Sequence, residues 1–201
     1  MRSGVILAGG RSTRFGDADK AVADLAGTPM VRRVAERIAP AVDEVIVNCR
    51  DDQRAAVADA LDGLSRPVSF ALDPDPDLGP TAGIAVGLDA AAGEYALVVA
   101  CDMPFVDPAF VEYLFDRAAG RDAAVPRPDE WFQPTQAVYR TAAMASACER
   151  VLDAEDRRVI AALSDLDSVV VDRAEIERHA SMETFENLNT REEFDAAHDR
   201  F

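Results

Sequence analysis

Short apolar runs alternate along the chain with segments in which apolar residues recur every three or four positions. Runs with the length of a buried strand lie at 4–8, 44–49, 68–72, 95–102, 122–126, 135–139 and 168–172. Patterns typical of helices lie at 29–39, 51–62, 81–91, 107–118, 140–151, 156–164 and 189–201. Strands that alternate with helices predict an α/β fold with three layers and a mostly parallel central sheet. We expect residues 1–201 to form a single domain, because this length suits one hydrophobic core.

The ends of the predicted helices carry recognisable signals. Pro29 suits the first turn of the helix at 29–39, and Asp107 suits the N-cap before Pro108. Asn189 or Thr190 is expected to cap the last helix. In a doubly wound sheet, ligands bind beyond the carboxyl ends of the strands. The loops after the first four strands are therefore where a functional site is expected.

The balance of charges limits the possible partners. The chain has 37 acidic and 21 basic residues and a net charge of -16. Such a surface repels phosphate backbones and anionic membranes, so we expect neither a nucleic acid nor a membrane as partner. Lys20 is the only lysine, and the acidic excess with few lysines favours a high-salt cytoplasm, where the Debye length falls to about 3 Å. No apolar run of about 20 residues and no leader pattern is found, so we expect a cytoplasmic protein.

The loop after the first strand contains paired glycines and two cations. Gly9 and Gly10 let the backbone approach a ligand closely, and Arg14 and Lys20 add positive charge nearby. The loop lacks the Gly-Lys-Ser/Thr ending of a Walker A motif and the glycine spacing of a dinucleotide fingerprint. Composition alone leaves a flexible surface turn as the alternative to a phosphate-binding loop.

Two aspartates follow later strands. Asp102 ends the continuous apolar run 95–102, where a carboxylate is costly unless a cation neutralises it. Mg²⁺ suits this position because it prefers oxygen ligands, although a turn aspartate is the structural alternative. Asp73 precedes a glycine-rich turn at 79–83, and it too could be ordinary surface charge.

Taken together, these motifs resemble those of the nucleotidyltransferases with a Rossmann-like fold, and most of all the molybdenum cofactor guanylyltransferases. The matching elements are Leu7-Ala8-Gly9-Gly10, Arg14, Gly16, Lys20, Val47-Asn48, Asp73, Gly79 to Gly83, Asp102-Met103-Pro104, Pro134-Thr135, Arg157-Arg158-Val159 and Asn187-Leu188-Asn189-Thr190. Thr81 stands where the family usually has leucine, and residues 127–133 have no clear counterpart.

The resemblance implies transfer of GMP from MgGTP to the phosphate of molybdopterin, with release of pyrophosphate. The implied catalytic residues are Arg14, Lys20 and Asp102, and Asp102 would hold Mg²⁺. Nucleotide contacts are implied for Leu7, Ala8, Gly9, Gly10, Lys20, Asn48, Asp73 and Asp102. The second substrate would meet Pro134, Thr135, Arg158, Asn187 and Asn189. Transient contact with proteins that make or accept the molybdenum cofactor is also implied.

Two other readings stay open on the sequence. One is a relative that uses CTP or another acceptor, such as a sugar phosphate or cobinamide phosphate. Gly9 argues against the cytidylyl branch, which tends to carry alanine there, because a missing Cβ leaves room for a purine. The other is a nucleotide-binding regulator without turnover, which the joint presence of Lys20 and Asp102 disfavours.

Overall fold

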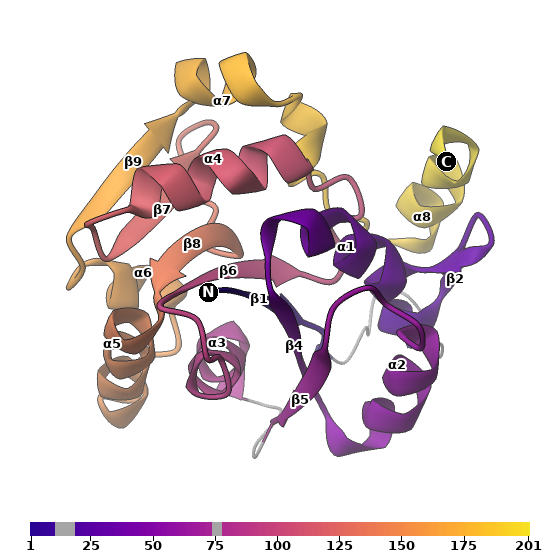
Figure 1. Cartoon of the computed structure of the whole chain (residues 1–201), viewed down its shortest axis with the longest axis horizontal. Helices are drawn as coiled ribbons and strands as arrows, with labels where there is room; N and C mark the ends of the chain where they lie inside the picture. The colour runs from indigo at the N-terminus through magenta and orange to yellow at the C-terminus, as the bar shows by residue number, and fades with distance from the viewer. Residues whose placement is uncertain (11–18, 74–77) are drawn as a thin grey trace.

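A central sheet organises the computed structural model, which describes residues 1–10, 19–73 and 78–201 (Figure 1). Within these residues the sheet has seven strands in the order β5-β4-β1-β6-β8-β7-β9. Their bounds are β1 Arg2–Leu7, β4 Glu44–Cys49, β5 Val68–Leu72, β6 Tyr95–Ala100, β7 Ala123–Arg127, β8 Gln136–Arg140 and β9 Ser168–Asp172. Each predicted strand is present, with its ends within two residues of those expected.

The direction of the strands places most of their carboxyl ends on one side. β1 pairs in parallel with β4 and β6, β4 with β5, and β7 with β9. Only β8 runs antiparallel to its neighbours β6 and β7. The carboxyl ends of the other strands therefore meet along one side of the sheet, here called the carboxyl edge. The predicted mostly parallel α/β fold is confirmed.

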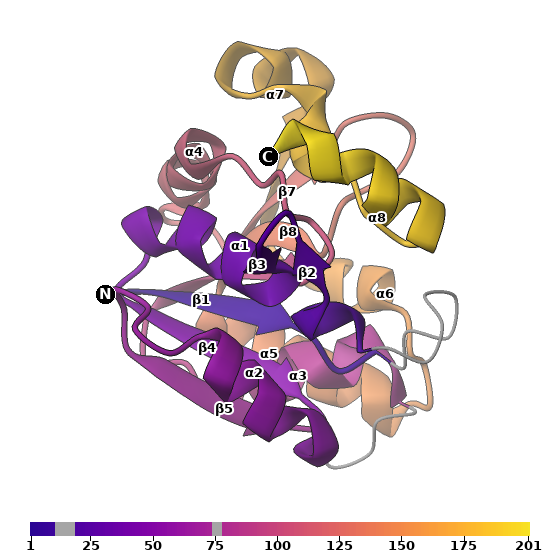
Figure 2. The ribbon, with the colours of Figure 1, turned by 90° about the vertical axis from the view of Figure 1, so that its right-hand side faces the viewer.

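Helices cover both faces of the sheet and complete the three layers (Figures 1 and 2). One face packs against α1 Met30–Ile38, α2 Arg54–Ala60, α4 Pro108–Ala118 and α7 Arg173–His179. The other packs against α3 Pro80–Asp89, α5 Thr141–Asp153 and α6 Val159–Leu163. Met30, Val34 and Ile38 recur along one face of α1 and are fully buried, as their spacing predicts.

Several helix ends follow from their capping residues. The Asp107 side chain accepts hydrogen bonds from the amides of Ala109 and Phe110 and so begins α4 where predicted. Thr190, rather than Asn189, caps α8 Arg191–Ala197 and forms a capping box with Glu193. The helix predicted at 156–164 begins only at Val159, after a turn in which the Asp156 carboxylate accepts the Arg158 amide at 2.9 Å.

Two short elements were not predicted near the site. β2 Asp24–Leu25 and β3 Thr28–Pro29 form a hairpin, so Pro29 ends a strand and precedes α1 instead of lying in its first turn. Its turn places Ala26 and Gly27 at φ 52° and 81°, the left-handed conformation that such two-residue loops require. Leu25 and Met30 then bury against Leu188, Phe194 and Ala197. This packing holds α8 on the side toward which β1 points (Figure 2).

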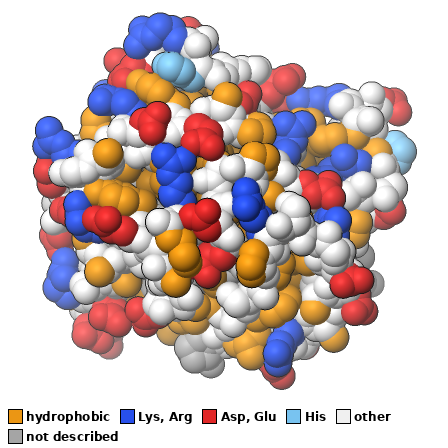
Figure 3. All heavy atoms as spheres, viewed as in Figure 1, with side chains coloured by type: hydrophobic (Ala, Val, Ile, Leu, Met, Phe, Trp, Pro, Cys, Tyr) orange, Lys and Arg blue, Asp and Glu red, His pale blue; other side chains and the backbone are white. Residues whose placement is uncertain are grey.

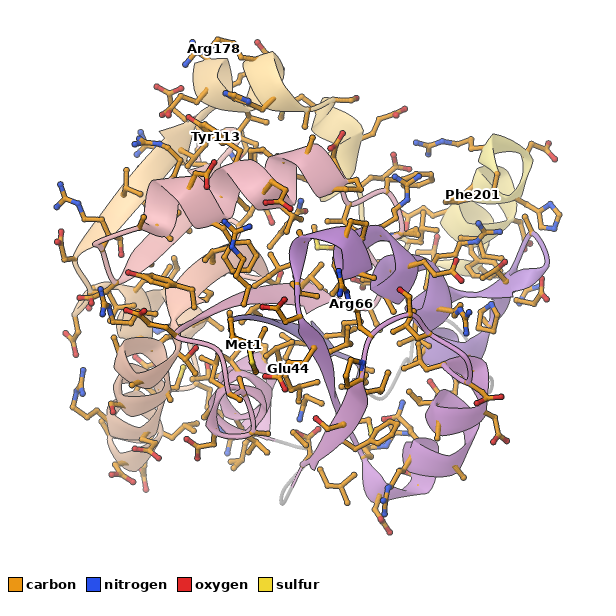
Figure 4. The ribbon with its side chains drawn as sticks, in the orientation of Figure 1. Met1, Glu44, Arg66, Tyr113, Arg178 and Phe201 are labelled. Atoms are coloured by element: carbon orange, nitrogen blue, oxygen red, sulfur yellow. The ribbon has the colours of Figure 1, made fainter. Side chains whose placement is uncertain are left out.

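The opposite, amino edge of the sheet is closed by buried polar contacts. Ser3 Oγ donates to Glu44 Oε1 at 2.6 Å and accepts the Gly93 amide at 2.9 Å. Glu44 lies near Met1 at this end of the sheet, whereas Tyr113 lies on α4 and Arg178 on α7 (Figure 4). On the face shown in Figure 3, acidic and arginine side chains are interspersed among apolar ones. Among the described residues, no helix has the length and apolar character needed to cross a membrane.

Candidate active site

A cavity of about 180 Å³ opens at the carboxyl edge between β1, β4, β5 and the start of α3. It is lined by Leu7, Gly9, Gly10, Asn48, Asp73, Gly79, Pro80 and Gly83. The loops after the first three large strands thus converge as the sheet rule predicts. The structure brings the predicted nucleotide-contact residues Leu7, Gly9, Gly10, Asn48 and Asp73 to one place.

Asn48 holds Asp73 in a fixed orientation within this cavity. Asn48 is buried, and its Nδ2 donates to Asp73 Oδ1 at 2.6 Å and to the Ala71 carbonyl at 3.2 Å. The Asp73 amide in turn donates to the Cys49 carbonyl at 3.0 Å. A carboxylate that is bonded on one oxygen and lines a cavity with the other can accept hydrogen bonds from a ligand.

Gly9 and Gly83 have no side chain, and this leaves space for the Asp73 carboxylate and the Asn48 amide. A Cβ on Gly9 would lie 2.1 Å from Asp73 Oδ2, and a Cβ on Gly83 would lie 2.4 Å from Asn48 Oδ1. Any side chain at either position would displace the pair. The sequence suggested that the missing Cβ of Gly9 leaves room for a purine. In the structure the Asp73 carboxylate occupies that space, so the lack of a side chain at Gly9 makes room for Asp73.

Lys20 and Asp102 form a second polar cluster next to the end of β6. Lys20 begins the short 3₁₀ helix η1 Lys20–Val22, and only 8% of the residue is exposed. Its Nζ lies 2.8 Å from Asp102 Oδ2. The other carboxylate oxygen, Asp102 Oδ1, is buried and has no hydrogen-bond partner among the described residues. A buried carboxylate oxygen without a partner is costly, so a ligand is expected to complete it.

That oxygen fits a divalent cation of the Mg²⁺ type. Mg²⁺ is commonly held by one or two carboxylates together with phosphate oxygens of the substrate and water. The described residues contain no group of three or more His, Cys, Asp or Glu side chains placed to hold a metal by themselves. Asp102 is thus suited to contribute one carboxylate oxygen to a metal that arrives with a phosphate ligand.

Gln53 joins the two ends of the glycine loop and was not identified from the sequence. Its side chain is buried, and its Nε2 donates to the Ala8 carbonyl at 3.1 Å and to Asp19 Oδ2 at 2.8 Å. Asp19 Oδ1 accepts the Ala21 amide at 3.0 Å and so caps the helix that carries Lys20. Ala8 lies at the start of the loop and Asp19 at its end. The only signal for this role in the sequence was the position of Gln53 shortly after β4, the second of the predicted strands.

Arg50 contacts the same loop from the exposed side. Its Nη1 donates to the carbonyls of Gly9 at 3.3 Å and Gly10 at 2.8 Å, and its Nε pairs with Asp52 at 3.0 Å. The Arg50 amide also donates to Gln53 Oε1 at 3.0 Å. With their carbonyls turned to Arg50, the two glycines are fixed in orientation relative to the cavity.

Most residues expected to meet a second substrate also lie near Asp102. The Leu188 amide donates to the Asp102 carbonyl at 3.0 Å, which places Asn187 and Asn189 on either side of that contact. The Thr135 carbonyl accepts the Ala100 amide at 3.0 Å, and the Pro134 carbonyl accepts the Tyr139 hydroxyl at 2.7 Å. Segments far apart in sequence are therefore joined at the end of β6.

Arg158 is held differently from the other predicted residues. Its guanidinium pairs with Asp156 at 2.6 Å, and 77% of its side chain is exposed. Hydrogen bonds from Arg158 lower the pKa of Asp156 to about 2. The neighbouring Arg157 carbonyl accepts Thr81 Oγ1 at 2.6 Å, so Thr81 joins α3 to this segment. This bond satisfies the hydroxyl of Thr81, which is fully buried.

Two residues remain: Arg14, which the resemblance implies to be catalytic, and Cys101, which the sequence does not single out. Arg14 lies outside the described residues. Cys101, beside Asp102, is not suited to act as a nucleophile, because burial strongly raises the pKa of its thiol, with the Asp102 charge adding to the effect. Among the described residues at the end of β6, the charged pair is therefore Lys20 and Asp102.

Comparison with known proteins assigns this arrangement to a class. Residues 4–169 match the family model described as the MobA-like NTP transferase domain, so the chain is a nucleotidyltransferase of that family. It is also 54% identical over 199 residues to a probable molybdenum cofactor guanylyltransferase from Natronomonas pharaonis, covering 99% of this chain and 98% of the relative. A relative of the same name from Haloferax mediterranei is 41% identical over 189 residues, with coverage of 94% and 89%. The chain belongs to the molybdenum cofactor guanylyltransferases, as its motifs indicated.

Solved structures agree with this assignment. A molybdopterin-guanine dinucleotide biosynthesis protein A from Archaeoglobus fulgidus superposes with a TM-score of 0.80 at 26% identity, covering 98% of this chain and 97% of that one. A 4-diphosphocytidyl-2C-methyl-D-erythritol synthase from Anaerococcus prevotii shares the fold alone, with a TM-score of 0.77 at 14% identity over 99% and 97% of the chains. The Rossmann-like nucleotidyltransferase fold is thus confirmed.

Proposed function

We propose that this enzyme transfers GMP from GTP to the phosphate of molybdopterin and releases pyrophosphate. The observation that carries the proposal is that the Asp73–Asn48 cavity and the Lys20–Asp102 pair lie on the same carboxyl edge of the sheet. The Asp73–Asn48 cavity suits a base, and the Lys20–Asp102 pair suits phosphates. The names of the relatives support the choice of substrates.

The Asp73 carboxylate accounts for the choice of guanine. Guanine presents two adjacent N–H donors, on N1 and on the 2-amino group, whereas cytosine presents one amino donor next to the acceptors N3 and O2. A carboxylate only accepts hydrogen bonds when ionised. Asn48 fixes Asp73 at 2.6 Å, and Gly9 keeps the carboxylate inside the cavity. A cytosine base could therefore donate to only one carboxylate oxygen, with its N3 acceptor next to the negative charge.

Lys20 and the glycine loop account for the phosphates. A lysine ammonium acts as a compact point charge, which can lie between oxygens of neighbouring phosphates. Gln53 and Asp19 hold Lys20 in position relative to the start of the loop. Arg14 is proposed to add charge for the departing pyrophosphate. Leu7 and Ala8, at the end of β1, are proposed to contact the guanosine.

Asp102 is proposed to hold Mg²⁺ through its unpartnered Oδ1. The bound ion would supply charge neutralisation for the triphosphate. Lys20 meanwhile keeps the other oxygen of Asp102 in place. Asn187 and Asn189, which lie beside the Asp102 backbone, are proposed to face the acceptor.

The reaction needs no general base in this arrangement. An oxygen of the acceptor phosphate is already anionic and forms the new bond to the α-phosphorus of GTP. The bond from that phosphorus to the bridging oxygen breaks, and pyrophosphate leaves with the electron pair. Catalysis then depends on positioning the two phosphates and neutralising their charge. The described residues supply a fixed cation and a fixed carboxylate for these two tasks.

Calorimetry with GTP and CTP tests the assignment. We expect GTP to bind at least about tenfold tighter, which corresponds to about 1.4 kcal/mol. Asp73→Asn should remove most of this preference, because the amide offers the base a donor as well as an acceptor. Asp62→Asn, on an exposed loop, is the matched control. Equal or tighter CTP binding to the unmodified enzyme would exclude the guanylyl assignment.

Pyrophosphate release separates the alternatives that remain. Release that requires both GTP and molybdopterin supports the proposal. Release with a sugar phosphate or cobinamide phosphate instead would identify another acceptor, and binding without release would identify a regulator. We place the reaction in the cytoplasm, and the product is proposed to pass to acceptor proteins by transient contact.

A further inference from the structure

A second cavity, of about 490 Å³, lies between α6 and the sheet strands β7 and β9. It is lined by Val125, Glu130, Trp131, Phe132, Ile160, Leu163, Ser164, Ser168 and Val170. Its size falls within the range typical of small-molecule sites. The walls are mostly apolar, and Glu130 contributes the one ionisable side chain among the lining residues.

The mouth of this cavity exposes large apolar side chains. Trp131 is 73% exposed and Ile160 is 46% exposed. Among the described residues, the other large hydrophobic residues that are exposed are Met1 and Phe201, at the two ends of the chain. Phe132 is steadied by Arg127, whose guanidinium lies 5.7 Å from the ring centre. Apolar groups gathered around a hollow with one carboxylate indicate a ligand that is flat and apolar on its faces and polar at its edge.

The two chain segments that form the walls of this cavity continue to residues beside the candidate active site. The loop that carries Trp131 continues to Thr135, whose carbonyl is bonded to Ala100, two residues before Asp102. Four residues of extended chain span at most about 14 Å. On the other wall, α6 begins just after Arg157, which Thr81 ties to the start of α3 beside the nucleotide cavity. Figure 2 shows α6 on the side toward which β1 points.

We propose that this cavity binds the pterin ring of the acceptor substrate. Trp131 stacks on a face of the ring system, and the Glu130 carboxylate accepts hydrogen bonds from the 2-amino group and the adjacent ring N–H. The inference rests on the proposed function, because a pterin acceptor makes this end of the carboxyl edge the acceptor side. A 2-amino-4-oxopyrimidine edge presents two neighbouring donors, which one carboxylate accepts together. The phosphate at the other end of the acceptor then extends toward Asp102.

Trp131 itself reports on binding, since it is the only tryptophan of the chain. The probes are pterin and lumazine, which has the same ring system but carries an oxygen in place of the 2-amino group. We expect saturable quenching of tryptophan emission, with pterin about tenfold tighter than lumazine, because a charged hydrogen bond is lost with lumazine. Titration of N-acetyltryptophanamide corrects for absorption by the probes.

Variants then separate the contacts. Glu130→Gln should reduce the preference for pterin to about twofold or less, whereas Glu149→Gln, an exposed carboxylate on α5, should leave it unchanged. GTP should not compete with the pterin. Equal affinities for the two probes, an unchanged preference in Glu130→Gln, or emission that changes on dilution without any probe would each overturn the proposal. The last result would show that a second copy covers the cavity.

Steady-state kinetics distinguish this inference from the proposed function. Trp131→Ala should raise the KM for molybdopterin at least about tenfold and leave the KM for GTP unchanged, because stacking contributes to binding of the ring alone. An unchanged KM for molybdopterin would overturn the pterin site while the guanylyltransferase reaction still stands. Absence of any GMP transfer by the unmodified enzyme would instead reject the proposed function.

Discussion

The part of the carboxyl edge proposed to bind the nucleotide, here called the nucleotide half, and the part proposed to bind the acceptor, here called the acceptor half, hold their side chains in different ways. On the nucleotide half, Asn48, Lys20 and Gln53 are buried, and each bonds to another group of the site. On the acceptor half, Trp131 lies mostly in solvent, and Arg158 pairs with its neighbour Asp156 at the surface. β8, which runs antiparallel to its neighbours in the seven-stranded sheet, lies between the two halves.

This difference has a physical reason. Hydrogen bonds shielded from water hold a charged or polar group in one geometry, which a triphosphate requires at several points at once. An exposed aromatic ring needs no such frame, because stacking tolerates small shifts in position. We infer that the nucleotide half is organised before its ligand arrives, whereas the acceptor half presents a cavity with an exposed ring at its mouth. The following predictions test this contrast, from the largest effect to the smallest.

Asp102→Asn should abolish Mg²⁺-dependent turnover, with a loss of at least about 10³-fold, because the ligand for the cation loses its charge. The side chain keeps its size, so the fold should persist by circular dichroism. Quenching of Trp131 by the pterin probe should not change, which would show that the two halves act separately. Near-normal rates at ordinary Mg²⁺ concentrations would show that Asp102 is not the principal ligand.

Lys20→Arg should lower kcat/KM for GTP by on the order of 10²–10³. A guanidinium is wider than an ammonium and presents a planar fork, so it does not fit the buried position 2.8 Å from Asp102 in the same way. Lys20→Ala should lose at least as much. The control is Arg66→Lys, where the Nε that bonds the Ala39 carbonyl lies far from the site. Activity of Lys20→Arg within a few-fold of the unmodified enzyme would refute a role for the shape of the lysine.

Gln53→Glu should lower kcat/KM for GTP by about tenfold, because it replaces a donor with an acceptor facing the Ala8 carbonyl and the Asp19 carboxylate. The pKa of the introduced carboxyl should rise beside Asp19, since a like charge disfavours its ionised form. Activity should therefore recover as the pH falls and the carboxyl becomes a donor again.

A matched control for Gln53→Glu is Ser3→Ala, at the amino end of β1, the strand that leads into the glycine loop. It removes a buried polar contact of comparable kind, to Glu44 and Gly93, without touching the loop. Its melting temperature should fall while kcat/KM stays constant. If both variants lost activity in proportion to their stability, Gln53 would have no specific role in positioning Lys20.

Salt should have the smallest effect and should act on both halves alike. With a net charge of -16, the melting temperature should rise between 0.1 and 3 M KCl as repulsion is screened. We propose that the chain works at high salt and unfolds as a single domain, so one transition is expected throughout. Thermal melts followed by circular dichroism and by Trp131 emission should coincide. Separate transitions would divide the two halves, and a melting temperature independent of salt would reject the high-salt proposal.

The sequence alone determined the strands, most of the helices and the positions of the principal groups. Apolar runs such as Tyr95–Ala100 specify buried strands wherever they lie, because their side chains must leave water on both faces. The glycine loop, Lys20 and Asp102 follow strand ends in chain order, so the sheet rule was enough to predict a common edge. α7 and the β2–β3 hairpin were missed, since each is short and carries little apolar periodicity.

Only the tertiary structure decided which groups hold one another. Gln53 contacts Ala8 and Asp19, residues 45 and 34 positions away, and no local pattern marks such a bond. The space at Gly9 belongs to Asp73 because β1 and β5 end on either side of β4. The apolar cavity beside Trp131 likewise forms only because α6 packs next to β7 and β9. Periodicity fixes which side of an element is buried, whereas contacts across loops depend on how the elements pack.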